Sequence, residues 1–270
     1  DDYPLLTILP RDEAPITATV VAENRPGRSV RWTWHPTAID SIVVSVRDDL
    51  ADGGCALVVR NTVKDAQATA AALEQAGITV LLTHAGFLAV DRAGNDEELR
   101  YLFGKDGIER PDRIAVVSTQ VVEQSLDVDF DVLYTDLAPA DLLLQRIGRL
   151  HRHARIRPPR HADTRLFLLA DLPSDDALPS ATPGSVAVYG SHLLLRTAAT
   201  FIEHGPTIRS PDDVARLVER ALGWGQVGRE TWQASLSEAR AAHERKIEKQ
   251  REKAAQWCVV PWTPDGDPRN

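Results

Sequence analysis

The stretch "CALVVRNTVKDAQATAAALEQAGITVLLTH", residues 55–84, decides the fold class of this chain. Residues 55–60 form a short apolar run that predicts a β-strand, and residues 62–77 form an alanine-rich helical segment that ends in a glycine. Residues 78–84 form a second apolar run and predict another strand. Because a helical segment connects the two strands, this stretch indicates a βαβ unit with parallel strands.

The same alternation continues along the chain. Residues 95–104 predict a helix, and residues 113–119, 130–137 and 164–170 predict further strands. Near-continuous apolar strands between helices are typical of an α/β protein with a parallel sheet covered by helices on both faces. Ligands of such sheets bind beyond the carboxyl ends of the strands, so we expect functional residues directly after each strand. These positions are Asn61, Thr62, His84, Thr119 and the segment from Leu137 onward.

Two segments flank the predicted sheet. Residues 15–36 alternate in polarity around an Asn-Arg-Pro-Gly turn and predict a β-hairpin that precedes the sheet. Residues 171–185 are rich in Pro, Ser and Asp, and residues 186–270 have helical periodicity. We therefore expect a sheet domain over residues 1–170, a linker over 171–185 and a small helical C-terminal accessory domain over 186–270.

Composition limits the setting in which the chain acts. The formal net charge is −8, so contact with nucleic acid must rest on local clusters or backbone amides and not on a global positive field. The two cysteines, Cys55 and Cys258, lack CxxC spacing, which argues against a disulfide framework and indicates a reducing, cytoplasmic compartment. No apolar run is long enough to span a bilayer, so we expect no membrane partner.

Residues 139–152 predict a helix that carries a cationic stripe and opens on a proline, which is tolerated in the first helical turn. At about 100° per residue, Gln145, Arg149 and Arg152 lie on one stripe, and an apolar stripe packs on the sheet. Arg146 lies on the flank, about 100° from Gln145, so we expect its loss to be milder than that of Arg149. Paired guanidiniums bind phosphate oxygens well, and a triphosphate held by a neighbouring lobe is the expected ligand.

Several segments resemble a known family. "QRIGRLHRH" (145–153) resembles motif VI of superfamily-two helicases, and "STQVVEQSLDVDFD" (118–131) with "TDLAPADLLLQR" (135–146) resembles the helicase-nuclease of type I CRISPR systems. "ALVVRNTVKDAQ" (56–67) and "LTHAGF" (82–87), with Arg92, resemble the segments that precede motif V in that family. The resemblance implies the second RecA-like lobe of an ATP-dependent single-stranded DNA helicase, followed by a C-terminal domain.

The resemblance also implies roles for individual residues. The expected catalytic residues are Arg149, Arg152 and Gln145. The residues expected to lie near the nucleotide and couple it to DNA are Glu123, Asp127 and Gly148, where the glycine permits close approach. The residues expected to contact single-stranded DNA are Thr119, Asn61, Thr62, His84 and Arg92. For Thr119, a hydroxyl and the backbone amides that follow a strand can hold a phosphate group.

The sequence contains no GxxxxGK[ST] phosphate loop. We therefore expect ATP and Mg²⁺ to be held mainly by a first helicase lobe, and we expect this chain alone to be inactive. That lobe and a metal-dependent nuclease domain are expected elsewhere in the parent protein or on a separate chain. The resemblance further implies recruitment by a crRNA-guided surveillance complex in CRISPR interference. The alternative is a non-enzymatic module that binds nucleic acid or that complex through the basic strip, residues 148–161.

No metal site is expected in this chain. Asp127, Asp129 and Asp131 alternate as in an EF-hand loop, but the sixth position is Val132 and the twelfth is Ala138, where Gly and Glu are required. We therefore interpret Asp129 and Asp131 as structural or solvent-facing. The histidines of the basic strip stand among arginines, which repel a divalent cation.

Overall fold

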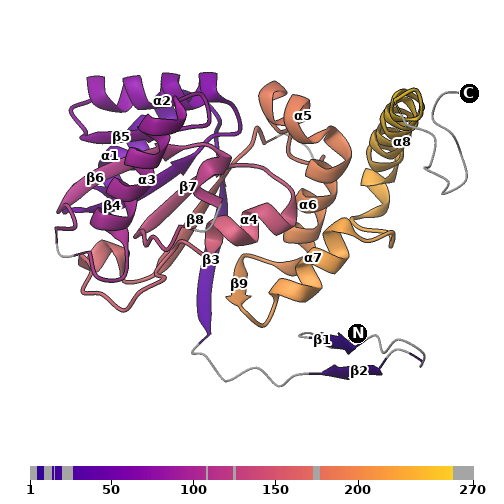
Figure 1. Ribbon diagram of the computed structural model, residues 1–270, viewed down its shortest axis with the longest axis horizontal. Helices are drawn as coiled ribbons and strands as arrows, with labels where there is room; N and C mark the ends of the chain where they lie inside the picture. Colours follow the sequence, from indigo (N-terminus) through magenta and orange to yellow (C-terminus); the bar gives the residue numbers. More distant parts are fainter. Residues whose placement is uncertain are drawn as a thin grey trace, which may run out of the picture.

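The computed structural model describes residues 5–8, 14, 16–19, 27–107, 109–123, 126–172 and 177–257. Its centre is a seven-stranded sheet of order β5-β6-β4-β7-β8-β3-β9 (Figure 1). The strands are β3 (Arg28–His35), β4 (Gly54–Val59), β5 (Val80–Thr83), β6 (Arg113–Ser118), β7 (Val132–Asp136), β8 (Thr164–Leu169) and β9 (Thr207–Ser210). All neighbouring strands are parallel except β9, which is antiparallel to β3. The predicted parallel sheet is confirmed.

Helices cover both faces of this sheet. The α-helices are α1 (Ile39–Asp49), α2 (Val63–Gln75), α3 (Ala89–Phe103), α4 (Ala140–Ile147), α5 (Pro183–Tyr189), α6 (Ser191–His204), α7 (Val214–Leu222) and α8 (Gln233–Ala255). Three short 3₁₀ turns are η1 (Gln120–Glu123), η2 (Pro159–His161) and η3 (Glu230–Trp232). Side chains of α1 and α2 share one hydrophobic cluster with the sheet, and side chains of α3, α4, α6 and α7 share the other.

Strand β4 shows why the central strands are continuously apolar. All six of its residues are buried. Cys55, Leu57 and Val59 join the cluster under α3 and α4, whereas Ala56 and Val58 join the cluster under α1 and α2. Since successive side chains of a strand point to opposite faces, a strand between two helical layers needs apolar residues at every position.

The predicted hairpin over residues 15–36 is wrong in its second strand. An antiparallel pair does precede the sheet, but it joins β1 (Leu5–Ile8) to β2 (Ile16–Thr19), and residues 20–26 of the predicted turn lie outside the described residues. Residues 28–35 instead form β3, which pairs with β8 and β9. Arg31 and Thr33 of β3 are exposed while Val30 and Trp32 are buried, and this one-sided burial produced the alternating pattern.

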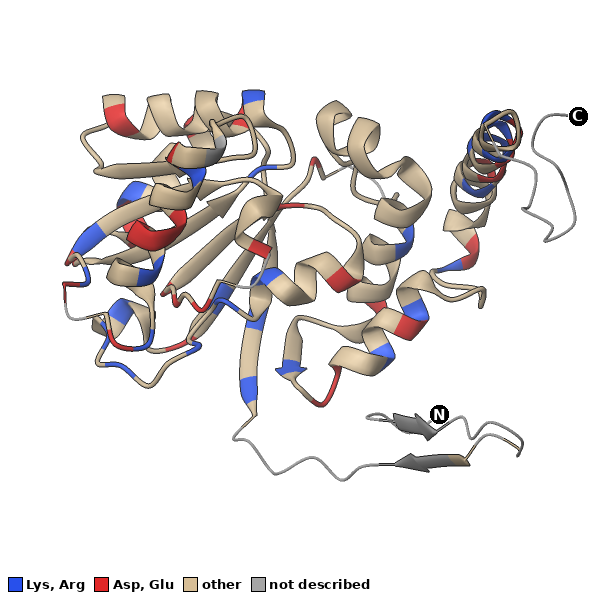
Figure 2. Cartoon of the chain, in the orientation of Figure 1, with Lys and Arg blue, Asp and Glu red and all other residues tan. Residues whose placement is uncertain are grey.

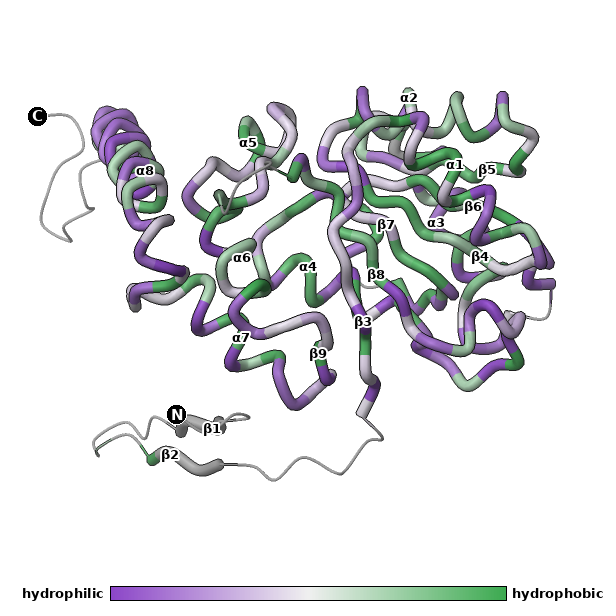
Figure 3. Tube along the Cα trace, turned by 180° about the vertical axis from the view of Figure 1, so that it is seen from behind, coloured by the Kyte–Doolittle hydropathy of each residue, from purple (hydrophilic) through white to green (hydrophobic). Residues whose placement is uncertain are grey.

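The helices expected to form an accessory domain share the core of the sheet. β9 extends the sheet through β3, and the Trp32 ring lies 5.8 Å from the Phe201 ring of α6. Trp32 also donates its indole N–H to the Gly205 carbonyl at 2.8 Å. By contrast, α8 lies at the far end of the molecule (Figure 1), where charges of both signs and hydrophilic residues cover it (Figures 2 and 3). Mixed charge of this kind is typical of a solvated helix face.

Candidate functional site

The carboxyl ends of three neighbouring strands bring predicted DNA-contacting residues to one edge. His84 and Thr119 directly follow β5 and β6, and Asn61 is the second residue after β4. The Thr119 amide donates to the Thr83 carbonyl at 3.3 Å, and the Asn61 side-chain amide donates to the Leu137 carbonyl at 2.8 Å. Hydrogen bonds therefore join the segments that follow these strands, although the segments are distant in sequence.

Most of these side chains are turned into the protein. Asn61, His84 and Thr119 are buried, Thr62 is half-buried, and only Arg92, on α3, is exposed. The His84 ring stacks on the Phe87 ring with centroids 4.3 Å apart. Buried side chains of this kind shape the edge, so its outer contacts fall to Thr62, Arg92 and the backbone.

The Asn61–Thr62 turn is fixed by two sets of contacts. The Thr62 hydroxyl caps α2, because it accepts a hydrogen bond from the Asp65 amide at 3.0 Å. The Asn61 side-chain amide donates to the Ser185 hydroxyl of α5 at 2.8 Å. A Cβ on Gly184 would lie 2.6 Å from the Thr62 methyl carbon, so α5 packs closely on this turn.

Arg146 is the centre of a buried polar network. Its side chain is fully buried, and its Nε donates to the Glu123 carboxylate at 2.7 Å. Its other nitrogens donate to the Thr135 hydroxyl at 2.6 Å, to the Asn61 Oδ1 at 3.0 Å and to the Tyr189 hydroxyl at 3.4 Å. One guanidinium thus connects η1, β7, the turn after β4, and α5.

We expected a milder effect from loss of Arg146 than from loss of Arg149 because Arg146 lies on the flank of the helix. That flank is buried. The helical wheel places Arg146 correctly about 100° from Gln145, which is exposed, but η1 and α5 cover that flank. Both covering segments come from other parts of the chain, so no periodicity within α4 could reveal them. We therefore expect loss of Arg146 to be severe.

The predicted helix over residues 139–152 ends early. α4 stops at Ile147, and His151 has a positive φ of 44°. Phe130 then forms a parallel bridge with Leu150, in which the Phe130 amide donates to the Arg149 carbonyl at 2.9 Å. The amides of Arg149 and Leu150 still form i→i−3 turn bonds, but the His151 amide donates to the Phe130 carbonyl at 3.0 Å. Gln145, Arg149 and Arg152 therefore do not form one continuous helical stripe.

Arg149 and Arg152 nevertheless face the same neighbouring segment. Arg149 is buried and donates to the carbonyls of Val122 at 3.2 Å and Glu123 at 3.0 Å. Arg152 is exposed and forms an ion pair with Asp127. Both arginines are therefore tied to the chain that runs from η1 to Asp127.

The carboxylates of this region have contrasting pKa values. Burial raises the pKa of Glu123, although the nearby Arg146 guanidinium acts in the opposite direction. The pKa of Asp127, which is exposed, is lowered mainly by its hydrogen bond with Arg152. Glu123 is thus a carboxylate whose charge depends on Arg146 staying in place.

Buried aspartates that precede the basic strip, residues 148–161, form ion pairs with two of its arginines. Arg157 forms ion pairs with both Asp129 and Asp131, and Arg155 forms one with Asp129 at 3.1 Å. Asp129 and Asp131 are buried, so the solvent-facing interpretation is wrong and the structural one is confirmed. Burial alone would raise the pKa of Asp131, but the Arg110 guanidinium and other partners lower it overall. Arg155 and Arg157 are therefore compensated by carboxylates inside the fold.

Sequence reasoning missed three residues of the network, namely Gln120, Thr135 and Tyr189. Gln120 donates its side-chain amide to the Asn61 carbonyl and to the Tyr189 hydroxyl, each at 3.0 Å. Gln120 directly follows Thr119, so its position after β6 was a usable signal. Tyr189 offered no such signal, because it ends a helix far away in sequence. Within the described residues, no group of three or more His, Cys, Asp or Glu side chains is placed to hold a metal ion.

Comparison with known proteins assigns the family. Residues 52–155 match the family model described as CRISPR-associated nuclease/helicase Cas3, C-terminal. The chain is 36% identical over 222 residues to the CRISPR-associated nuclease/helicase Cas3 of Streptococcus thermophilus, across 82% of this chain and 23% of that protein. The chain belongs to the Cas3 family. Cas3 of Thermus thermophilus is 47% identical to it over 143 residues, across 53% of this chain and 15% of that protein.

Solved structures agree with this assignment. A crystal structure of a CRISPR-associated protein superposes with a TM-score of 0.83 at 30% identity, over 94% of this chain and 29% of that one. T. fusca Cas3 superposes with a TM-score of 0.78 at 29% identity, over 93% of this chain and 30% of that one. The chain thus has the RecA-like fold of a Cas3 helicase region and spans less than a third of these relatives' length. T. fusca Cas3 has also been solved with AMPPNP, ADP and ATP.

Proposed function

We propose that this chain is the second lobe of an ATP-dependent single-stranded DNA translocase that acts in CRISPR interference, with the nuclease domain outside the chain. Residues 1–170 form the lobe, residues 171–185 the connection and residues 186–270 the accessory region, whose β9 completes the edge of the sheet. Recruitment by a crRNA-guided surveillance complex fits the similarity to a chain in such a complex before nicking. None of the helices in the described ranges could cross a membrane, and the proposed setting is the cytoplasm.

The observation that carries the proposal is the set of contacts made by η1 and by Asp127. At one end, Gln120 donates to the Asn61 carbonyl at the carboxyl edge of the sheet. At the other end, the carbonyl of Glu123 accepts from Arg149, and Asp127 pairs with Arg152. η1 therefore contacts both the proposed DNA edge, through Gln120, and a proposed nucleotide arginine, through Glu123, as a coupling element must.

Arg149 and Arg152 are the residues we propose to act on ATP bound mainly by the first lobe. A guanidinium that meets the γ-phosphate stabilises negative charge during phosphoryl transfer, and bound Mg²⁺ would neutralise part of the same charge. Arg152 is exposed and can exchange Asp127 for a phosphate. Arg149 is anchored to backbone carbonyls, which fixes its direction, and Gln145 stands exposed on α4 beside it. The contact of Gly148 with the nucleotide stays a prediction.

At the DNA edge we propose contacts to the phosphate backbone. The candidates are Thr62, Arg92 and the backbone amides after β6, with Thr119, Asn61 and His84 supporting them from within. Oriented amides can bind phosphates without a positive overall charge, which suits a chain of net charge −8. Affinity should therefore fall as salt rises and should depend little on base sequence.

The alternative of a non-enzymatic module that binds through the basic strip is disfavoured by the ion pairs of that strip. Arg155, Arg157 and Arg160 each pair with a buried aspartate, so a nucleic acid would have to displace partners inside the fold. Displacing the buried pairs would leave buried carboxylates uncompensated, which is costly.

Measuring ATP turnover with and without the first lobe tests the proposal. The purified chain alone should hydrolyse no ATP, because phosphoryl transfer requires a phosphate-loop lysine and a magnesium-holding acid. Addition of the first lobe of the parent protein should restore turnover that single-stranded DNA stimulates. Robust turnover by the chain alone, or a reassembled pair that ignores DNA, would refute the split site.

A further inference from the structure

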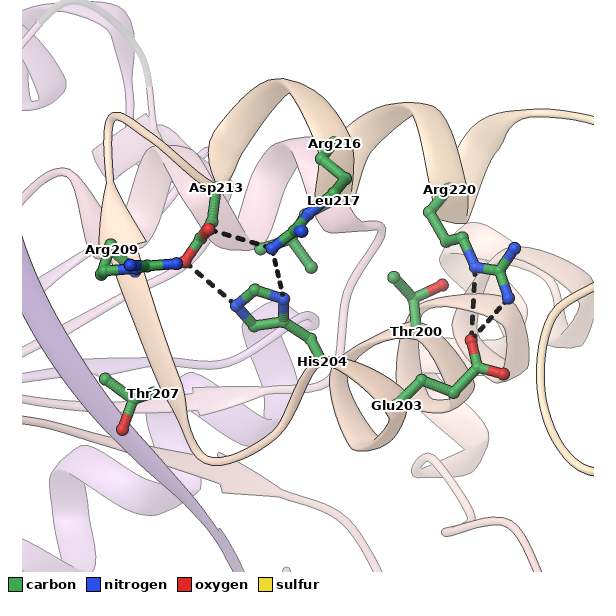
Figure 4. Close-up of a pocket in the computed structure, with 9 residues that line it drawn as sticks. All are labelled: Thr200, Glu203, His204, Thr207, Arg209, Asp213, Arg216, Leu217 and Arg220. Atoms are coloured by element: carbon green, nitrogen blue, oxygen red, sulfur yellow. Dashed lines mark hydrogen bonds and ion pairs between the residues drawn. The ribbon is translucent and has the colours of Figure 1, made fainter.

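A second cationic cluster lines a cavity between α6, β9 and α7, away from the helicase site (Figure 4). The cavity has a volume of about 730 Å³. Its charged and titratable side chains are Arg209, Arg216, Arg220, His204, Asp213 and Glu203. None of them contributes to the network around Arg146.

Asp213 holds the backbone of Arg209 and the side chain of Arg216 in place. Its carboxylate is 4% exposed, and it accepts hydrogen bonds from the Arg209 amide at 2.8 Å and from Arg216 Nη2 at 3.1 Å. The side chains of Arg209 and Arg216 are 65% and 66% exposed. The cavity therefore presents guanidinium N–H groups, while the carboxylate that organises them is covered.

Glu203 orders the third arginine in the same way. Its Oε2 accepts from Arg220 Nη2 at 3.0 Å, and its Oε1 accepts from the Gly228 amide at 2.8 Å. The buried Arg196 donates to the carbonyl of Arg220 at 2.9 Å, which fixes the end of α7. Arg220 is thus held at the cavity wall with about half of its side chain exposed.

Thr200 supplies an independent sign of an absent partner. The residue is 2% exposed and lines the cavity between His204 and Arg220 (Figure 4). Its hydroxyl has no hydrogen-bond partner among the described residues. A buried hydroxyl without a partner loses its hydrogen bonds to water, so such a group facing a cavity favours a ligand that completes it.

We propose that this cavity binds a phosphate group. Three guanidiniums face two carboxylates, so the lining is positive before His204 is counted. Guanidinium forks match phosphate oxygens in pairs, and an oxygen seated between His204 and Arg220 would give Thr200 its partner. The phosphate can belong to a nucleic-acid backbone or to a free phosphate compound. The site does not depend on ATP turnover at the helicase edge.

Two binding measurements on the whole chain separate the sources. Anisotropy of labelled oligo(dT) reports a nucleic-acid backbone, and calorimetry with inorganic phosphate reports a free anion. The test variant is Arg209→Gln with Arg216→Gln. The control is Arg245→Gln with Arg251→Gln on α8, which removes two charges from exposed positions elsewhere. We expect the test variant to weaken binding of one probe by roughly 10-fold or more, and the control to change it little.

The outcomes assign or overturn the site. Loss of oligo(dT) affinity, with a salt slope reduced by roughly 0.7 per lost contact, identifies a nucleic-acid strand. Loss of phosphate affinity alone identifies a free phosphate compound. If the test variant melts early, Arg220→Gln and Thr200→Val replace it, because each leaves Asp213 and its partners intact. The proposal fails if the wild-type chain binds neither probe, or if the variants bind both as the control does.

Discussion

Two clusters of arginines in this chain pair with carboxylates, but the arginine side chains of one cluster are mostly buried and those of the other are exposed. Arg146 of α4 is fully buried, and Arg157 of the basic strip is mostly buried. Carboxylates inside the fold compensate the charge of both. Around α7, Arg209 and Arg216 stand more than half exposed over a covered aspartate. Charge counted along a sequence therefore does not show which cations can meet a ligand. The two clusters differ in the exposure of their side chains, which the sequence alone does not give.

Replacement of Arg146 should give the largest loss of stability. Arg146→Ala leaves the carboxylate of Glu123 buried without its cation, and we expect the free energy of unfolding to fall by about 3–5 kcal/mol. The exposed Arg216 of the other cluster is the matched control, and Arg216→Ala should cost about 1 kcal/mol or less. Denaturant unfolding of both variants measures the difference. Equal losses would erase the contrast between the two clusters.

A smaller effect is expected at Tyr189. Tyr189→Phe removes the hydroxyl that joins Gln120 to Arg146, and the net loss should be about 0.5–1.5 kcal/mol. Tyr101→Phe, on an exposed part of α3, is the control and should change stability by less. If Tyr189→Phe is neutral while Arg146→Ala is severe, α5 covers the network without stabilising it.

The smallest expected effect is a pH dependence in the α6–α8 contact. Burial, aided by the neighbouring His243, lowers the pKa of His192 to about 4 from an ordinary value of 6.5. The folded state therefore binds fewer protons than the unfolded state, so the contribution of His192 is fully present above pH 6.5 and is lost as pH falls toward 4. The protection of α8 amides against hydrogen exchange, taken relative to their intrinsic exchange rates at each pH, should fall over this range in the wild-type chain. Exchange that is equally pH-dependent in His192→Phe would show that another group is responsible.

Sequence reasoning succeeded where local patterns decide the structure. The continuous apolar runs identified the strands β4 to β8 and so placed Asn61 and Thr119 at the carboxyl ends of β4 and β6. It failed where distant segments decide. β3 pairs with strands more than 120 residues later, α4 ends because Leu150 bridges Phe130, and Arg146 is covered by η1 and α5. Pairing and covering between distant segments leave no periodic signal in either one.

We propose that Arg149 acts on ATP bound by another lobe. In the reassembled enzyme, Arg149→Ala should lower DNA-stimulated ATP turnover by roughly 10³-fold or more, while nucleotide affinity changes far less. Arg149→Lys should restore little, because an ammonium lacks the planar fork. The enzyme with Arg251→Ala, a change at an exposed position on α8, should hydrolyse ATP at the wild-type rate. Unchanged turnover in a folded Arg149→Ala enzyme would contradict the account.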